Sequence, residues 1–260
     1  YDSVAGIMQP GNDGNVTCNA APSKYVEWSS SNSNIATVTG NGNAATIKAI
    51  SGGTATITAA IPADGLQYSF NVTVGVTIAE DTVEVGQGQS VALTTNSNSV
   101  SDVYWWSADE NVATVSNGVV YGVYAGSTTV YASCLDHNPN NNAGDSVTVK
   151  VPYVVNTPET TVLVGDKIAI STTANPSEVN YASSNNNIVS YDSKTGMFTA
   201  NSTGTADVTV TWNGHVETIT ITVIDGFSLS NTSMSLNIGT KGSVTAMVSN
   251  TEQPVPWKLS

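Results

Sequence analysis

The sequence has no arginine and only seven lysines, against twenty aspartates and glutamates, so its formal net charge is −13 and its pI is about 4.1. Proteins that bind nucleic acids use lysine and arginine to replace the counterions of the phosphate backbone. A surface this acidic would repel that backbone, so we expect no nucleic-acid partner. For the same reason an anionic membrane surface is disfavoured.

Long hydrophobic runs and charged residues are also scarce. No apolar stretch approaches the ~18 residues of a transmembrane helix, so we expect no membrane insertion in this segment. Only 10% of the residues are charged, against about 25% in ordinary soluble domains. Serine, threonine, asparagine and glycine take their place, and the β-branched residues among the rest favour strands.

Three landmarks recur along the chain at a spacing of roughly 76 residues, which indicates internal repeats. The first pairs a tryptophan with serine, and the second is a short apolar segment some six residues later. The third is a glycine that leads into an alternating strand. The landmarks begin at Trp28, Trp106 and Ala182, at Ile35, Val112 and Ile188, and at Gly53, Gly126 and Gly204.

The alternation within each repeat has a period of two, which is the signature of a half-buried strand. In the second repeat we predict strands at 76–80, 81–86, 90–96, 103–108, 112–116, 119–125, 127–135 and 145–151. The first two form one split edge strand. About seven short strands without helical periodicity indicate a small antiparallel sandwich.

The pattern W-S-S-x-N-x-x-(I/V)-A-T-V, followed by G-T-A-T-I-T-A, resembles the bacterial immunoglobulin-like domain, group 2. The sequence carries it from Trp28 to Ala59 and from Trp106 to Ala132. The third repeat departs where Ala182 replaces the tryptophan and where Ser190-Tyr191 replaces Thr-Val. The resemblance implies an all-β fold of tandem immunoglobulin-like antiparallel β-sandwiches, and it specifies function poorly.

The repeats divide the chain into module 1 (1–75), module 2 (76–151), module 3 (152–225) and an incomplete module 4 (226–260). The junctions contain no Gly/Ser tether, so we predict an elongated array that behaves as a stiff rod. Module 4 is too short to bury a core alone. Either the natural chain continues beyond Ser260, or another chain completes module 4 by strand addition and so drives self-assembly.

Two cysteines occur, Cys18 and Cys134, at positions that other repeats fill with apolar residues. They fall in different modules, so we predict two buried free thiols and no disulfide. His137 and His215 also fall in different modules and outside any metal-ligand spacing. They are expected to be solvated loop residues. We expect no catalytic residues, and therefore no enzyme and no obligatory cofactor.

The asparagine-rich loop of module 2 holds several oxygen ligands of the kind that Ca²⁺ prefers. The candidate metal ligands are Asp136, Asn138, Asn140 and Asp145. The loop has neither the D-x-D-x-D-G run nor the bidentate glutamate of an EF-hand. The alternative is a plain hairpin loop without an ion.

A candidate binding surface also lies in module 2. Alternation predicts Trp106 inward and Trp105 outward, and on the neighbouring strand Val130 inward and Tyr131 outward. Trp105 and Tyr131 would then form an exposed aromatic patch, which is typical of sites for partners or sugar rings. The alternative is a patch that a loop or an adjoining module covers.

These features predict a non-catalytic structural or adhesive protein, extracellular or at a cell surface, whose modules mediate attachment to a protein or glycan or display a distal domain. One alternative is a bacteriophage virion protein, such as a head decoration or a tail fibre. Another is the accessory carbohydrate-binding region of a secreted enzyme.

Overall fold

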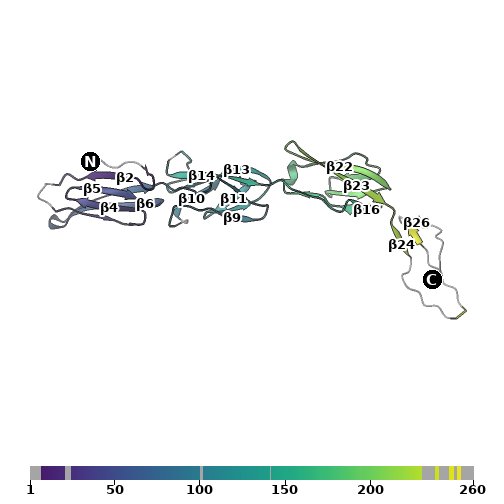
Figure 1. Cartoon of the computed structure of the whole chain (residues 1–260), viewed down its shortest axis with the longest axis horizontal. Coiled ribbons are helices and arrows are strands. Elements are labelled where there is room, and N and C mark those ends of the chain that lie inside the picture. The colour runs from purple at the N-terminus through teal and green to yellow at the C-terminus, as the bar shows by residue number, and fades with distance from the viewer. Residues whose placement is uncertain are drawn as a thin grey trace. The chain divides into compact units, whose positions relative to one another are not determined.

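The computed structural model describes residues 7–20, 25–99, 102–140, 142–229, 238–239, 246–248 and 251–252. The described residues form strands, turns and short 3₁₀ helices, which confirms the predicted all-β fold. Their contacts divide the chain into two compact units, Tyr1–Pro152 and Tyr153–Ser260 (Figure 1). None of the described helices has the length and the hydropathy that crossing a bilayer requires.

Module 1 consists of a four-stranded sheet, in the order β1-β7-β6-β3, and a three-stranded sheet, in the order β2-β5-β4. A short 3₁₀ helix, η1 (Pro62–Asp64), lies in the hairpin between β6 and β7. The strands are β1 (Ile7–Met8), β2 (Asp13–Thr17), β3 (Glu27–Ser30), β4 (Ala36–Asn41), β5 (Ala44–Ala49), β6 (Gly53–Ile61) and β7 (Leu66–Val74).

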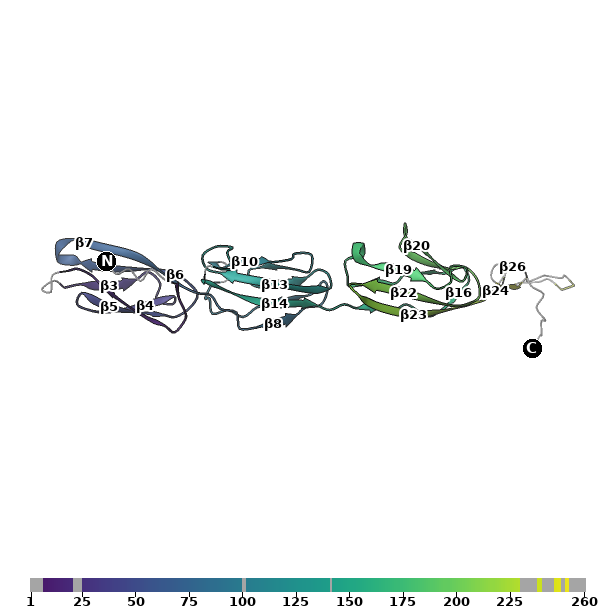
Figure 2. The same ribbon diagram turned by 90° about the horizontal axis from the view of Figure 1, so that it is seen from above.

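Module 2 repeats this plan, with the sheets β10-β13-β14-β8 and β11-β12-β9, and Figure 2 shows the first of these sheets in that order. The strands are β8 (Thr82–Glu84), β9 (Ser90–Ala92), β10 (Tyr104–Ser107), β11 (Ala113–Ser116), β12 (Val119–Gly122), β13 (Gly126–Ser133) and β14 (Gly144–Val151).

Module 3 has the sheets β16-β23-β22-β19 and β17-β21-β20, and a two-stranded ladder, β15-β18. A second 3₁₀ turn, η3 (Pro176–Glu178), precedes β19. The strands are β15 (Val155–Asn156), β16 (Thr161–Leu163), β17 (Lys167–Ile168), β18 (Ser171–Thr172), β19 (Asn180–Ser183), β20 (Val189–Asp192), β21 (Met197–Ala200), β22 (Gly204–Trp212) and β23 (His215–Ile224).

Beyond module 3 the described residues form one small sheet, in the order β24-β25-β26. Its strands are β24 (Phe227–Leu229), β25 (Ala246–Val248) and β26 (Thr251–Glu252). Most of the predicted incomplete module lies outside the described residues, so its completion stays a prediction.

The predicted strands of module 2 differ from the structure in two respects. The segment 76–80 is not a strand, and it pairs with a neighbouring segment through an isolated bridge between Ile78 and Thr95. The sheets are also not purely antiparallel, because an early strand of each module pairs in parallel with its last strand, as β8 pairs with β14. This pairing closes the sheet edge that the last strand would otherwise expose.

The repeated glycine marks the same turn in every module. Gly53, Gly126 and Gly204 have positive φ angles of 143°, 154° and 137°. A Cβ atom at any of them would lie within 2.9 Å of the apolar side chain that begins the second landmark, Ile35, Val112 or Ile188. The position therefore needs glycine both for its backbone conformation and for its packing.

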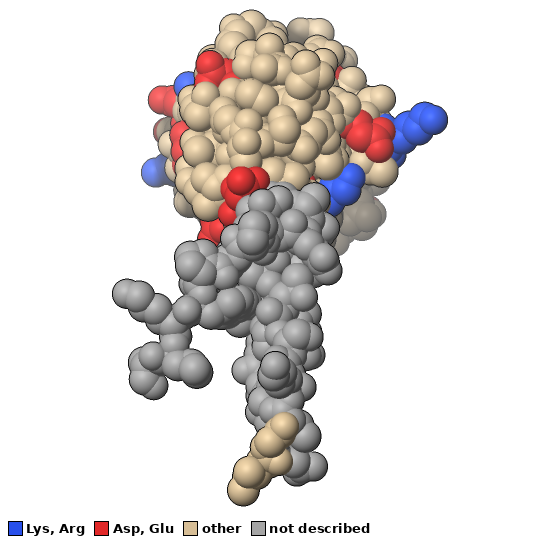
Figure 3. All heavy atoms as spheres, turned by 90° about the vertical axis from the view of Figure 1, so that its right-hand side faces the viewer, with Lys and Arg blue, Asp and Glu red and all other residues tan. Residues whose placement is uncertain are grey.

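The strand that begins at this glycine contributes buried residues to the core of its module. Its fifth residue is fully buried in each module, as Ile57, Val130 and Val208. Each sandwich has its own cluster of buried aliphatic side chains. Figure 3 shows one face of the molecule, on which acidic and basic side chains are few among uncharged ones.

Candidate functional site

The two adjacent tryptophans of module 2 lie on opposite faces of their sheet, and the predicted assignment of these faces is wrong. Trp105 packs against the core of module 2, and its indole nitrogen is buried. Trp106 instead stacks on Tyr131, with ring centroids 5.1 Å apart and an interplanar angle of 14°. Val130 is buried and Tyr131 lies outward, as the alternation of β13 predicts.

The strand pairing explains the error. Trp28 pairs with Ala59 and Trp105 pairs with Ala132, each at the seventh residue of the strand that the repeated glycine begins. The recurring pattern is therefore an aromatic residue two positions before a serine, and not a Trp-Ser pair. Because side chains alternate along a strand, the slip of one residue exchanged the two faces.

The corrected register also identifies the inward aromatic residue of module 3. We call the residue at this inward position the anchor of its module. The structural equivalent of Trp28 and Trp105 is Tyr181, and not Ala182, because Tyr181 pairs with Val210 on β22. Tyr181 packs against the core of module 3, and its hydroxyl donates a hydrogen bond to the Ile170 carbonyl at 3.2 Å. All three modules thus place a large ring at this inward position.

The outward neighbour of the anchor differs between the modules. In module 2 it is Trp106, and the cross-strand residue is Tyr131. Module 1 has Ser29 and Thr58 at these positions, and module 3 has Ala182 and Thr209.

The loop between β13 and β14 extends the aromatic cluster. His137 lies 5.3 Å from Trp106 and 5.2 Å from Tyr104 between ring centroids, in a T-shaped arrangement with each ring. It is exposed to solvent on its other side. This contact could not be predicted from the sequence, because His137 and Trp106 are far apart in the chain. His215 also contacts aromatic rings, those of Tyr153 and Trp212.

A small cleft of about 170 Å³ lies between the aromatic pair and this loop. Its lining residues are Trp106, Tyr131, Ala132, Asn138, Pro139, Gly144, Asp145 and Ser146. No lysine contributes to the lining, so the cleft does not favour an anionic ligand.

The candidate calcium ligands of the loop serve other contacts. The side-chain oxygen of Asp136 accepts a hydrogen bond from the Asn138 amide at 3.0 Å, and that of Asn138 accepts one from the Asn140 amide at 3.0 Å. The Asp145 carboxylate accepts hydrogen bonds from the Ile78 and Ser146 amides, at 2.9 and 2.8 Å.

Within the part of the chain that the structure describes, no three His, Cys, Asp or Glu side chains gather as a metal site. Through its hydrogen bond with the Ile78 amide, Asp145 connects the first segment of module 2 to its last strand. Calcium binding by this loop, part of which lies outside the described residues, stays a prediction.

Modules 1 and 2, which lie in one unit, meet at a junction with many hydrogen bonds. The side chain of Asn96 accepts a hydrogen bond from the Thr77 amide at 2.8 Å and donates one to the Gly75 carbonyl at 3.2 Å. Asn98 Nδ2 donates to Ser51 Oγ at 2.9 Å. The segment 96–98 thus binds both the connecting residues and the end of module 1.

The long loop between β13 and β14 contributes further contacts at the junction. The Val76 amide donates to the Ala143 carbonyl at 3.1 Å, and Gln9 Nε2 donates to the Asn142 carbonyl at 3.3 Å. Val76 itself is only 1% exposed. A peptide connection that is buried and bonded on both sides cannot swivel without breaking these contacts.

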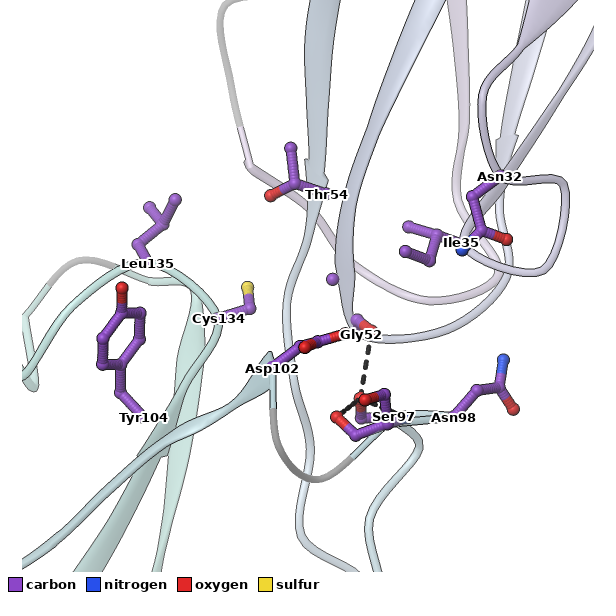
Figure 4. Close-up of a pocket in the computed structure, with 12 residues that line it drawn as sticks. Asn32, Ile35, Gly52, Thr54, Ser97, Asn98, Asp102, Tyr104, Cys134 and Leu135 are labelled. Carbon is purple, nitrogen blue, oxygen red and sulfur yellow. Dashed lines mark hydrogen bonds between the residues drawn. The ribbon is translucent and has the colours of Figure 1, made fainter. Parts of the chain in front are cut away.

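A cleft of about 300 Å³ opens at this junction, with Ile35 and Thr54 from module 1 and Tyr104, Cys134 and Leu135 from module 2 in its lining (Figure 4). The Cys134 thiol donates a hydrogen bond to the Val74 carbonyl at 3.1 Å. Burial raises the pKa of this thiol. A thiol that stays protonated and bonded to a carbonyl is a poor nucleophile, so the cysteine acts here as a structural contact.

Both cysteines are free, as predicted. Both are half-buried, whereas the sequence predicts full burial. Each cysteine directly follows a strand, Cys18 after β2 and Cys134 after β13.

The paired sheets, the shared ring anchor and the repeated glycine define a class of protein, the tandem immunoglobulin-like β-sandwich. More specifically, the sequence model of the bacterial Ig-like domain (group 2) matches residues 7–64 and 72–137. Over these matched residues, modules 1 and 2 are therefore tandem domains of this family, as the sequence predicts.

Several solved structures are similar to the chain. An intimin fragment in complex with the intimin-binding domain of its translocated receptor is 14% identical, with a TM-score of 0.29, over 55% of this chain and 58% of that one. Invasin, a bacterial integrin-binding protein, is 12% identical, with a TM-score of 0.26, over 82% and 54%. Domains 4–9 of the surface layer protein SbsC are 16% identical, with a TM-score of 0.23, over 90% and 46%.

The chain thus spans about half the length of these three structures. At such low identities the likeness concerns the fold alone. No curated protein matches the chain in sequence.

Proposed function

We propose that the chain is a non-catalytic structural segment of a surface protein, in which Ig-like modules hold a fixed spacing for attachment or display. The observation that carries this proposal is the bonded junction between modules 1 and 2. A loop of module 2, residues 96–98, engages both the connecting residues and the end of module 1. A junction of this kind transmits orientation from one module to the next.

The composition supports an extracellular or cell-surface location. The chain is acidic, lacks arginine and is rich in uncharged polar residues. Its partners are then proteins or glycans of a surface. The Cys134 thiol and the candidate metal ligand Asp145 both have structural hydrogen bonds, which supports a non-catalytic role.

The test measures backbone ¹⁵N relaxation of the full chain. If the junction is fixed, modules 1 and 2 share one rotational diffusion tensor. The double variant Asn96→Ala/Asn98→Ala removes the side-chain bonds of the junction, so the two modules should acquire separate tensors while each stays folded. The matched control is Asn71→Ala, which removes an exposed asparagine from a sheet of module 1.

Independent tumbling of the two modules in the unmodified chain would contradict the proposal. So would a double variant whose modules still tumble together, because the fixed orientation would then not depend on this loop.

A further inference from the structure

Two features distinguish module 2 from modules 1 and 3, and both lie at the same place. The first is the outward row of side chains across the sheet. In modules 1 and 3 this row consists of small residues. The three rows are Trp106, Tyr131 and Ser146 in module 2, Ser29, Thr58 and Ser69 in module 1, and Ala182, Thr209 and Thr218 in module 3.

The second feature is the hairpin that follows the row. Module 3 closes it with a two-residue turn, Asn213-Gly214, and module 1 closes it with η1. In module 2 a longer loop connects β13, which ends at Ser133, to β14, which begins at Gly144. This loop carries His137 onto the ring of Trp106.

The sandwich needs neither feature, because modules 1 and 3 have the same sheets and the same inward ring without them. The rings of the outward pair stay partly exposed, so part of their apolar surface remains in contact with water. A large outward ring pair with a loop beside it is more typical of a ligand site than of a structural element.

The lining of the cleft defines the chemistry of the ligand. The rings of Trp106 and Tyr131 with Pro139 offer apolar surface, and Asn138 and Ser146 add hydrogen-bonding groups. Asn138 Oδ1 accepts a hydrogen bond from the Asn140 amide. Flat apolar walls with a few polar groups suit a ligand that has both an apolar face and hydroxyl groups.

The size of the cleft and the charge of the chain narrow the class of ligand further. The volume of about 170 Å³ lies below the roughly 300–1,000 Å³ of pockets for drug-sized ligands, so one small ring fits. No lysine lines the cleft, and the chain has a net charge of −13. Negatively charged sugars would therefore be repelled.

We propose that the cleft between the Trp106–Tyr131 pair and the 134–143 loop of module 2 binds a single neutral sugar ring of a surface polysaccharide. This proposal deepens the proposed function, since it assigns the attachment site to one module and its ligand to one chemical class. Its test is separate from that of the junction, because neither Asn96 nor Asn98, the two residues varied there, lines this cleft.

The experiment applies the full chain to an array of neutral, N-acetylated, sialylated and sulfated glycans. Binding of oligosaccharides of glucose, galactose, mannose and N-acetylglucosamine is then measured by titration calorimetry. The unmodified chain should bind at least one neutral or N-acetylated class and no anionic one. The variant Trp106→Ser/Tyr131→Thr gives module 2 the row of module 1, so it should fold and should lose at least tenfold in affinity.

The matched control is Tyr121→Thr, which removes a ring that is 45% exposed on the other sheet of module 2. It should bind as the unmodified chain does. The single variant Tyr131→Thr replaces the double variant if the latter melts early.

Three outcomes overturn the proposal: a folded chain that binds no neutral glycan, binding confined to anionic glycans, and equal binding by the double variant. Failure here leaves the relaxation test of the junction unaffected, and failure of that test leaves this one unaffected.

Discussion

Modules 1 and 2 place a tryptophan at the same inward position, yet the two indoles are held differently. Trp28 Nε1 donates a hydrogen bond to the Gly42 carbonyl at 3.1 Å. Trp105 Nε1 is buried and has no hydrogen-bond partner among the described residues. Module 3 uses Tyr181 instead. The sandwich therefore requires a large ring at this position, and it does not require one particular hydrogen bond.

The position one residue further along shows the opposite behaviour. It varies from Ser29 to Trp106 to Ala182 while the fold stays the same. The inward position thus carries stability, and the outward position is free to carry a function. Three experiments test this division, in order of decreasing effect.

The largest effect is expected from a comparison of Trp105→Ala with Trp106→Ser. Removal of Trp105 leaves a cavity against the core of module 2 and should destabilise that module by about 3 kcal/mol. Removal of Trp106, which lies on the outer face, should cost less than about 1 kcal/mol. Urea unfolding of the full chain, followed through the methyl signals of Val130, measures both values.

Equal costs for the two substitutions would contradict the inward position of Trp105. A larger cost for Trp106→Ser would favour the original assignment of the two faces.

A smaller effect separates the two anchors from each other. Trp28→Phe loses ring volume and the hydrogen bond from Nε1 to the Gly42 carbonyl, so that this carbonyl must bind water instead. Trp105→Phe loses the same volume and relieves a buried, unpaired N–H. The same substitution should therefore cost about 1 kcal/mol more in module 1 than in module 2, which is the size of one hydrogen bond. Calorimetry of the full chain measures the difference.

Two further variants control for the difference between the two sites. Leu66→Ser in module 1 and Tyr121→Ser in module 2 alter exposed side chains and should change neither transition. If Trp105→Phe proves the more costly substitution, Trp105 Nε1 has a partner in solution.

Local features of the fold could be predicted from the sequence, because they depend on neighbouring residues. The turn at Gly53, with its contact to Ile35, and the buried strand that follows recur as a readable pattern. The register of the tryptophans could not be predicted in the same way. Trp105-Trp106 offers two alignments to the pattern, and only the pairing of Trp105 with Ala132 decides between them.

The candidate site was predicted only in part, for a similar reason. Tyr131 follows from the alternation of its own strand. The contact of His137 with Trp106 depends on how a long loop folds back over the sheet, which no short pattern encodes. The hydrogen bond from the Ile78 amide to Asp145 likewise joins the two ends of module 2. Long-range contacts of this kind decided which of the predicted residues lie together.

The smallest effect concerns pH and distinguishes the tyrosine anchor from the tryptophan anchors. Burial raises the pKa of Tyr181, and repulsion by the negative charges that Tyr191 and Tyr153 carry when ionised raises it further. The folded state then resists ionisation more than the unfolded state does. This contribution to stability is complete below the unfolded pKa of about 10, and it is lost as the pH rises from there through the folded pKa.

Above about pH 10, module 3 of the unmodified chain should therefore lose more stability than module 3 of a Tyr181→Phe variant. Solvent screens a half-buried group, so the difference should stay below about 1 kcal/mol. Thermal unfolding of the full chain between pH 8 and 11, followed through the signals of Phe198, measures it. Tyr121→Phe in module 2, at an exposed position, should leave the pH profile unchanged. If Tyr181→Phe has the same profile as the unmodified chain, the hydroxyl that bonds Ile170 contributes nothing to the anchor, and the three modules differ in their rings alone.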